Sequence, residues 1–360
     1  MKTVKPVLLI LGLLLSMKIY AAPKISFFVE LPASGIDSLF SDSTLIQQLV
    51  EMKSSLRIGI MDFSPERIAV IKKLNRAGVP VTAWLLLPIN EGYWFNMNNG
   101  VKATQRYHEF KQWTRSNDLR WAGIGIDIEP DFNEIRLMMK HPFRVAANMY
   151  LQLYRNEPMR KGKEIYGQLV REMEADGYRV ESYIIPMIDD EREAGTTSFQ
   201  KLTGLLDIET PVTIPMAYTS ATGNPAIIQV YHHPGMPLGL GSTGGGVVIE
   251  GMSAPVISWD NLERDLLISN RLTSVVVIFS LEGAWENGWL SKIASIDYSQ
   301  PVPDIHEKVE AFDDTRKIFR SIFLALDHPL SFTITLAIVI NAILYLVAII
   351  ILGLVRLIVK

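Results

Sequence analysis

The chain has 360 residues, with 35 Lys and Arg against 38 Asp and Glu, and it contains no cysteine. This near-neutral balance gives no electrostatic footprint for nucleic acid, so we expect no nucleic-acid partner. The missing thiols exclude disulfides, a cysteine nucleophile and Cys-ligated metal sites. An exported protein of this size without disulfides must depend on its core, which fits a bacterial envelope better than eukaryotic secretion.

Both ends of the chain carry patterns that concern a membrane. Residues 1–22 begin with Lys2 and Lys5, continue with an apolar run and end in small residues, which is typical of a secretory signal peptide. Residues 330–355 contain no charged side chain, and at about 1.5 Å per residue they can cross a ~30 Å hydrocarbon core. We therefore expect a signal peptide, a transmembrane helix over 330–358, and the chain between them outside the cytoplasm, in the periplasm or at the cell surface.

Between these ends, apolar runs of strand length alternate with helix-like stretches, a rhythm that indicates a parallel sheet. The expected strands are 24–31, 56–63, 81–88, 121–131, 178–187, 210–218, 236–241 and 274–281. The expected helices are 38–52, 65–77, 104–116 and 259–272, with two more between 132 and 177. Eight such strands predict a (β/α)8 TIM barrel over residues 23–300, followed by a charged, partly helical stalk over 301–329.

Acidic residues fall at or just after the carboxyl ends of the expected strands. The set is Glu30, Asp62, Asp127, Glu129, Asp189 and Glu282. A TIM barrel keeps its chemistry at this end, so we expect these side chains around one mouth. Alternatively, any one of them caps the following helix or forms a salt bridge.

Asp127 and Glu129 alternate along one strand, so their side chains project to the same side, and Pro130 then ends the strand. At roughly 6 to 7 Å apart, two partly desolvated carboxyls cannot both ionise easily. The more buried one should hold its proton near neutral pH. Paired carboxyls with displaced pKa values are the groups that cleave glycosidic bonds.

The loop 89–101 is rich in aromatic rings and amides, among them Trp94. Exposed rings and amides suit a sugar-binding lip, whereas the alternative is that Trp94 packs the loop down. The stretch 239–244 matches a dinucleotide fingerprint by letter but opens onto a strand-like run, so we expect no nucleotide cofactor. Histidines do not gather at strand ends, so we expect no metal site either.

Four stretches of the chain resemble motifs of a known family. Gly123-Ile-Gly-Ile-Asp-Ile-Glu129 resembles the fourth-strand signature D-G-x-D-x-D-x-E of the family 18 glycoside hydrolases, the chitinase-like barrels. Pro215-Met-Ala-Tyr-Thr219 resembles their sixth-strand M-x-Y-D, and 237–241 and 275–283 look like their seventh and eighth strands. The resemblance implies Glu129 as catalytic acid, Asp127 as the aspartate beside it and Tyr218 as the tyrosine that steadies the substrate.

The chain departs from that pattern at four positions. Ala122 and Gly125 replace the first two aspartates of the signature, Thr219 replaces the aspartate after the tyrosine, and Phe279 stands where the floor tryptophan would be. Besides the catalytic residues, the residues expected to bind substrate are Glu30, Asp62, Trp94, Phe279 and Glu282.

We therefore expect a membrane-anchored, extracytoplasmic glycoside hydrolase-like barrel that acts on a poly- or oligosaccharide. In one mechanism Asp127 tunes Glu129 and polarises the nucleophile, and in a second Glu282 or Glu30 is the protein nucleophile. The rival is a non-catalytic carbohydrate-binding or envelope scaffold protein on a degenerate barrel.

Overall fold

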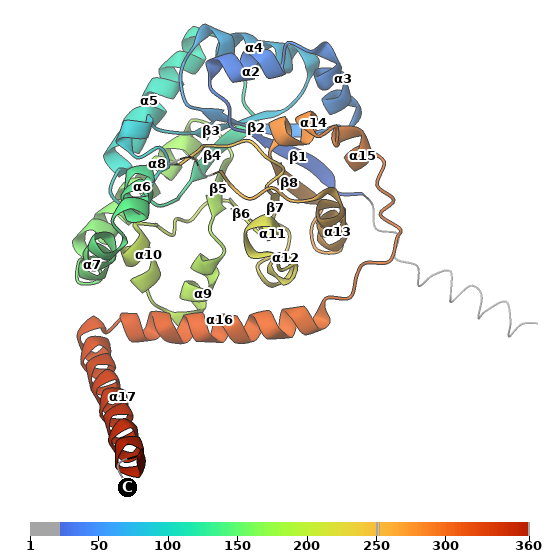
Figure 1. Cartoon of the computed structure of the whole chain (residues 1–360). Coiled ribbons are helices and arrows are strands. Elements are labelled where there is room, and N and C mark those ends of the chain that lie inside the picture. Colours follow the sequence, from blue (N-terminus) through green and yellow to red (C-terminus); the bar gives the residue numbers. More distant parts are fainter. Residues whose placement is uncertain (1–21, 250, 252, 359–360) are drawn as a thin grey trace, which may run out of the picture.

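The computed structural model describes residues 22–249, 251 and 253–358. The expected signal peptide therefore lies outside the described residues, apart from its last position. Eight parallel strands form a ring in the order β6-β5-β4-β3-β2-β1-β8-β7 (Figure 1). They are β1 Lys24–Val29, β2 Ser55–Ile60, β3 Val81–Leu85, β4 Gly123–Asp127, β5 Val180–Ile184, β6 Val212–Pro215, β7 Leu238–Gly241 and β8 Val275–Phe279.

A single parallel bridge joins the two end strands of this sheet. It links Met216, just after β6, to Gly239 in β7, and the Ala217 amide donates to the Gly239 carbonyl at 2.9 Å. The ring is thereby nearly closed, with helices around it, and the fold is the TIM barrel that the sequence predicts.

The expected helices are present with two differences, and further short helices connect the later strands. They are α2 Ala33–Leu39, α3 Ser43–Glu51, α4 Pro65–Ala77, the 3-10 helix η1 Ile89–Glu91, α5 Gly100–Ser116, α6 Phe132–Lys140, α7 Pro142–Gln152, α8 Glu157–Ala175, α9 Met187–Ala194, α10 Ser198–Thr203, α11 Thr219–Thr222, α12 Ala226–Val230, α13 Trp259–Ser269, α14 Leu281–Glu286 and α15 Leu290–Ala294. The helix expected over 38–52 is split because Asp42 caps α3, accepting from the Thr44 amide at 2.8 Å. Between β4 and β5 there are three helices where two were expected.

Alternation along each strand separates two apolar layers. On β1, Phe27 and Val29 face the helices, whereas Phe28 faces the barrel interior. There the Phe28 ring meets the rings of Trp84 and Tyr183, with centroids 5.3 Å and 4.8 Å away. These rings fill the middle of the barrel, so the open space is confined to its carboxyl end.

Toward the amino ends of the strands, the interior holds an ion pair. Arg57 on β2 donates from Nε and Nη2 to the two carboxylate oxygens of Glu181 on β5, at 2.6 Å and 3.0 Å. Arg57 also donates to the Ser26 hydroxyl at 2.5 Å, and the Tyr183 hydroxyl donates to Glu181 at 2.9 Å. This end of the barrel is therefore closed by a bidentate pair whose polar atoms are satisfied.

Within the segment expected to be a charged, partly helical stalk, a helix packs against the barrel. Helix α16, His306–Leu326, lies across α9 and α12 (Figure 1). Its buried Arg316 donates to Asp190 at 2.6 Å and to Glu193 at 2.8 Å, and Ser198 donates to the Phe323 carbonyl at 2.8 Å. The sequence could not indicate this, because the acids that hold Arg316 lie more than a hundred residues before it.

Helix α17, Pro329–Ile358, follows α16 with two residues between them. Its segment Pro329–Ile349 has a mean hydropathy of 2.5 with none of that stretch buried, and it is long and apolar enough to cross a membrane.

Candidate active site

A cavity of about 690 Å³ lies at the carboxyl ends of the strands. It brings together six of the residues expected at the site: Glu30, Trp94, Asp127, Glu129, Tyr218 and Phe279. This is the end of a TIM barrel where loops can build an active site without disturbing the strands.

The Asp127–Glu129 pair is held by the end of β4 and by a loop that pairs with it. The Phe95 amide donates to the Asp127 carbonyl, and the Glu129 amide donates to the Phe95 carbonyl, both at 3.1 Å. Asp127 is buried and its Oδ1 has no hydrogen-bond partner among the described residues, whereas Glu129 is partly exposed to the cavity. Glu129 is therefore the member of the pair that a ligand can reach.

Burial dominates the proton affinities of this pair. It raises the pKa of Asp127 well above its usual range, and the charges of Glu129 and Glu30 raise it further. Burial also raises the pKa of Glu129 to about 7, although the hydrogen bond with Asp127 lowers it. Burial therefore favours the protonated form of Asp127, while Glu129 is close to its midpoint near neutral pH.

Glu30 follows β1 and supplies the third carboxyl of the cavity. It accepts from the Tyr93 hydroxyl at 2.7 Å and from the Val247 amide at 3.2 Å. Burial raises the pKa of Glu30 to about 8 against these hydrogen bonds, helped by the charges of Glu282 and Glu129. Tyr93 has a φ of 62°, which is uncommon for a bulky residue, and sequence reasoning missed its role in positioning Glu30.

Glu282 and Asp62, both expected at the site, are not among the residues that line the cavity. Glu282 lies behind Glu30, whose backbone amide donates to it at 3.2 Å, and burial raises the pKa of Glu282 to about 7. Asp62 pairs with the buried Arg67 at 2.9 Å. Burial alone would raise the pKa of Asp62, but the hydrogen bonds from Arg67 and Ser64 hold it below its usual range.

Asp189 also lies apart from this cavity. It bonds Arg192 at 2.7 Å and His233 at 2.6 Å. The six acids predicted at the mouth thus divide into three that line the cavity and three that have other partners, as the capping and salt-bridge alternative allows.

The aromatic loop after β3 differs from the expected lip of exposed rings. Tyr93 and Phe95 are buried, and only 6% of Trp94 is exposed. The Trp94 ring packs edge-on against Tyr93 at 5.1 Å while lining the cavity. The amide of Asn99 donates to the Trp94 carbonyl at 2.9 Å, so it organises the loop and is not directed at a ligand.

Tyr218 and Phe279 form one wall of the cavity. Their rings are stacked, with centroids 6.0 Å apart and planes 28° apart. Burial raises the pKa of Tyr218 well above its usual value, and the charges of Asp127 and Glu129 add to this. The Tyr218 hydroxyl therefore stays protonated and can donate a hydrogen bond beside the acids.

Gly125 shows why the fourth-strand signature is incomplete in this chain. A Cβ at this position would overlap the hydroxyl of Tyr183. Tyr183 fills the barrel and bonds Glu181, so the space where the signature has an aspartate is already occupied.

Sequence reasoning also missed the helical walls of the cavity. Ile135 and Met139 line it from α6, and Phe312 and Phe319 line it from α16. The two phenylalanines lie seven residues apart with Arg316 between them, a spacing that places all three on one helix face and could have indicated packing.

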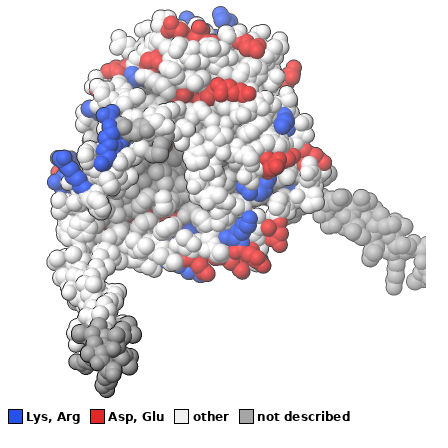
Figure 2. Space-filling model, viewed as in Figure 1, with Lys and Arg blue, Asp and Glu red and all other residues white. Residues whose placement is uncertain are grey.

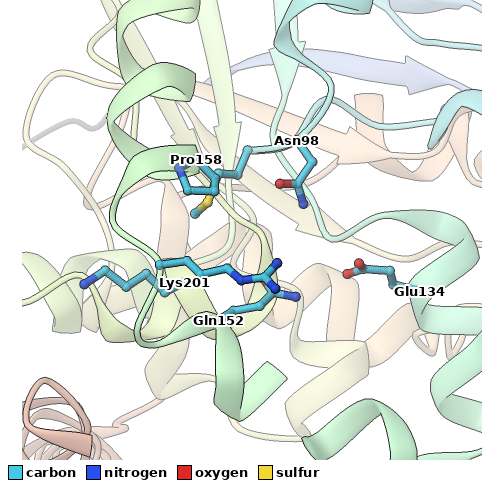
Figure 3. Close-up of a pocket in the computed structure, with 7 residues that line it drawn as sticks. Asn98, Glu134, Gln152, Pro158 and Lys201 are labelled. Atoms are coloured by element: carbon cyan, nitrogen blue, oxygen red, sulfur yellow. The ribbon is translucent and has the colours of Figure 1, made fainter. Parts of the chain in front are cut away.

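A second, smaller cavity of about 270 Å³ lies between the loop after β3 and helices α6, α7, α8 and α10. In Figure 3, Asn98 and Glu134 face Gln152 across it. It contains none of the three carboxyls described above, so we place the candidate chemistry in the larger cavity. Among the described residues, no group of three or more acids and histidines could hold a metal ion.

No known family model matches the sequence, and no curated protein matches it. Among solved structures, Saccharomyces cerevisiae Gas2 in complex with a compound matches with 13% identity and a TM-score of 0.40, covering 82% of this chain and 71% of that chain. A mutant of Gas2p in complex with laminaritetraose and laminaripentaose matches with 11% identity and a TM-score of 0.40, covering 82% and 70%. The assignment of the barrel therefore rests on its own strand order, and the resemblance to family 18 rests on the sequence motifs.

Proposed function

We propose that this protein cleaves glycosidic bonds with Glu129 as the general acid. One observation carries the proposal: three carboxyls without a cationic partner among the described residues share one cavity at the carboxyl end of the barrel, and burial raises their pKa values. A carboxyl with a pKa near 7 can both give and take a proton at neutral pH. The family 18 resemblance supports the same assignment.

In this proposal, Glu129 protonates the leaving oxygen and Asp127 tunes its proton affinity from the buried side. Of the two carboxyls that could serve as a protein nucleophile, Glu30 is the one within reach, because Glu282 lies behind it and does not line the cavity. Burial raises the pKa of Glu30 to about 8, so Glu30 would have to give up its proton before it could attack. Where the substrate supplies its own nucleophile, Tyr218 would orient it from the neighbouring wall. We further propose that α17 anchors the barrel outside the cytoplasm.

The test uses the full-length chain in detergent, screened on chromogenic glycosides, oligosaccharides and peptidoglycan. We expect Glu129→Gln to lower turnover about 10²- to 10⁴-fold while ligand binding stays nearly intact, because the amide keeps the shape and loses the transferable proton. Glu164→Gln, an exposed acid on α8, is the matched control and should leave turnover unchanged.

Wild-type turnover in Glu129→Gln would show that another residue is the acid. If nothing is cleaved but oligosaccharides bind at this cavity, the carbohydrate-binding alternative replaces the proposed hydrolase.

A further inference from the structure

The walls of the large cavity are mostly apolar, unlike its floor. Besides the residues already named, it is lined by Phe28, Trp84, Ile185, Met187, Met216, Ile227, Val247 and Ile249. Two tyrosine hydroxyls at the lining are already used, since Tyr183 donates to Glu181 and Tyr231 donates to Asp190. A long oligosaccharide needs polar groups for its hydroxyls along the whole site, whereas here the carboxyls are gathered at the floor.

The apolar lining continues to the outer surface at α6. Met139 lines the cavity and is 36% exposed. Around it, exposed apolar residues form what we term the α6–α7 patch, namely Leu137, Met138, Met139, Phe143, Leu151 and Tyr154. Phe143 is 91% exposed, and exposed apolar patches of this kind mark contact with a membrane or another apolar partner.

The α6–α7 patch lies beside the start of α17. The Tyr150 hydroxyl on α7 donates to the Pro329 carbonyl at 2.8 Å and also bonds Thr333. Phe319 in the cavity lies seven residues before the end of α16, which is about 10 Å along that helix, and α17 begins after two further residues. With α17 in a bilayer, the patch and the open side of the cavity lie at the membrane surface.

Charge supports this placement. Figure 2 shows Lys and Arg side chains gathered where α6 and α7 lie, with uncharged surface from there to α17. Arg136, Lys140 and Arg144 belong to these two helices. Basic side chains around an apolar patch suit a membrane interface with anionic head groups.

We propose that the substrate is a glycolipid, whose sugar lies at the carboxyls and whose hydrocarbon chain leaves between α6 and α16 into the bilayer. The sugar end rests on the proposed function, while the apolar route stands on the cavity walls and the α6–α7 patch. Each methylene that the route buries should tighten binding about fourfold.

The test places full-length Glu129→Gln protein in lipid nanodiscs, so that binding is measured without turnover. The probes are glucosyl- and N-acetylglucosaminyl-diacylglycerol with a diazirine in the acyl chain, compared with phosphatidylcholine carrying the same chain. Photolabelling of α6 and α16 peptides, read by mass spectrometry, should be at least fivefold stronger with a glycolipid than with phosphatidylcholine.

Two variants of the route provide independent checks. Met139→Asp on α6 and Phe319→Asn on α16 should each lower glycolipid labelling at least fivefold. Val101→Asp changes an exposed apolar residue on α5 that does not line the cavity, and it should leave labelling within twofold.

Equal labelling by both glycolipids and phosphatidylcholine overturns the proposal. It also fails if wild type cleaves free glycosides as efficiently as glycolipids and neither route variant changes this; the proposed hydrolase then stands with a soluble substrate. Sugar-dependent labelling without any turnover by wild type supports the glycolipid and removes the hydrolase.

Discussion

The barrel interior holds two groups of acids that differ in their partners. Toward the amino ends of the strands, Glu181 makes a bidentate pair with Arg57. At the carboxyl ends, Glu30, Asp127 and Glu129 face one cavity and form no ion pair among the described residues. Burying a charge costs several kcal/mol unless it is paired, so an unpaired buried acid is held neutral or has a task. The acids of the candidate site therefore differ from Glu181 in having no cationic partner among the described residues, and not in the kind of side chain.

The largest expected effect on stability comes from breaking the Arg57–Glu181 pair. Arg57→Met should lower the free energy of unfolding by about 3 to 5 kcal/mol, because Glu181 would be left buried without its cation. Chemical denaturation followed by tryptophan fluorescence measures the loss. The double variant Arg57→Met with Glu181→Met should recover most of it, and Arg160→Met on the surface should cost at most about 1 kcal/mol. A mild loss in the single variant would mean that Glu181 finds another partner.

A second effect should be a pH dependence of the free energy of unfolding, caused by the acids at the carboxyl ends of the strands. The pKa of Glu30 is raised from 4.5 to about 8, so the folded state binds more protons than the unfolded state between these values. Stability should therefore fall as pH rises from about 4.5 to 8, by on the order of a few kcal/mol. Denaturation at pH 5 and pH 8 measures this slope. Glu30→Gln should make this slope shallower and Glu164→Gln should not, while the raised pKa values of Asp127, Glu129 and Glu282 keep the rest of it. An unchanged slope in Glu30→Gln would refute the contribution of Glu30.

The smallest expected effect concerns the aromatic rings in the middle of the barrel, between the two groups of acids. Gly125→Ala should destabilise the barrel by about 1 to 3 kcal/mol, because the new methyl group overlaps the Tyr183 hydroxyl. Adding Tyr183→Phe removes that hydroxyl, so the double variant should lose less than the sum of the two single losses. A double-mutant cycle on unfolding free energies checks this, and additive losses would place the strain elsewhere.

Local patterns were sufficient to predict much of the fold. The helix expected over 65–77 is α4, whose two ends are marked by Ser64, accepting from the Arg67 amide, and by Gly78, at a φ of 77°. Strand alternation likewise predicted that Asp127 and Glu129 project to one side, and both line the cavity. These features depend on residues close together in the sequence.

The contacts that the sequence could not indicate join residues far apart in the chain. Glu282 looks like the other strand-end acids, yet the Glu30 amide, which lies 252 residues away, holds it outside the cavity. Arg316 looks like part of a solvated stalk, yet Asp190 binds it from 126 residues away. Such pairings need the folded barrel to bring the partners together, and no local period encodes them.

The packing of α16 also sets where this protein can work. A barrel on a flexible stalk could take many orientations above its anchor. Here Arg316 and Ser198 hold α16 against the barrel, and only two residues separate α16 from α17. With α17 in a bilayer, the cavity is kept at a nearly constant height above the lipid. For a substrate that is itself held in the membrane, encounters would then be governed by lateral diffusion in two dimensions, so surface density in the membrane, and not bulk concentration, would set the rate of encounter.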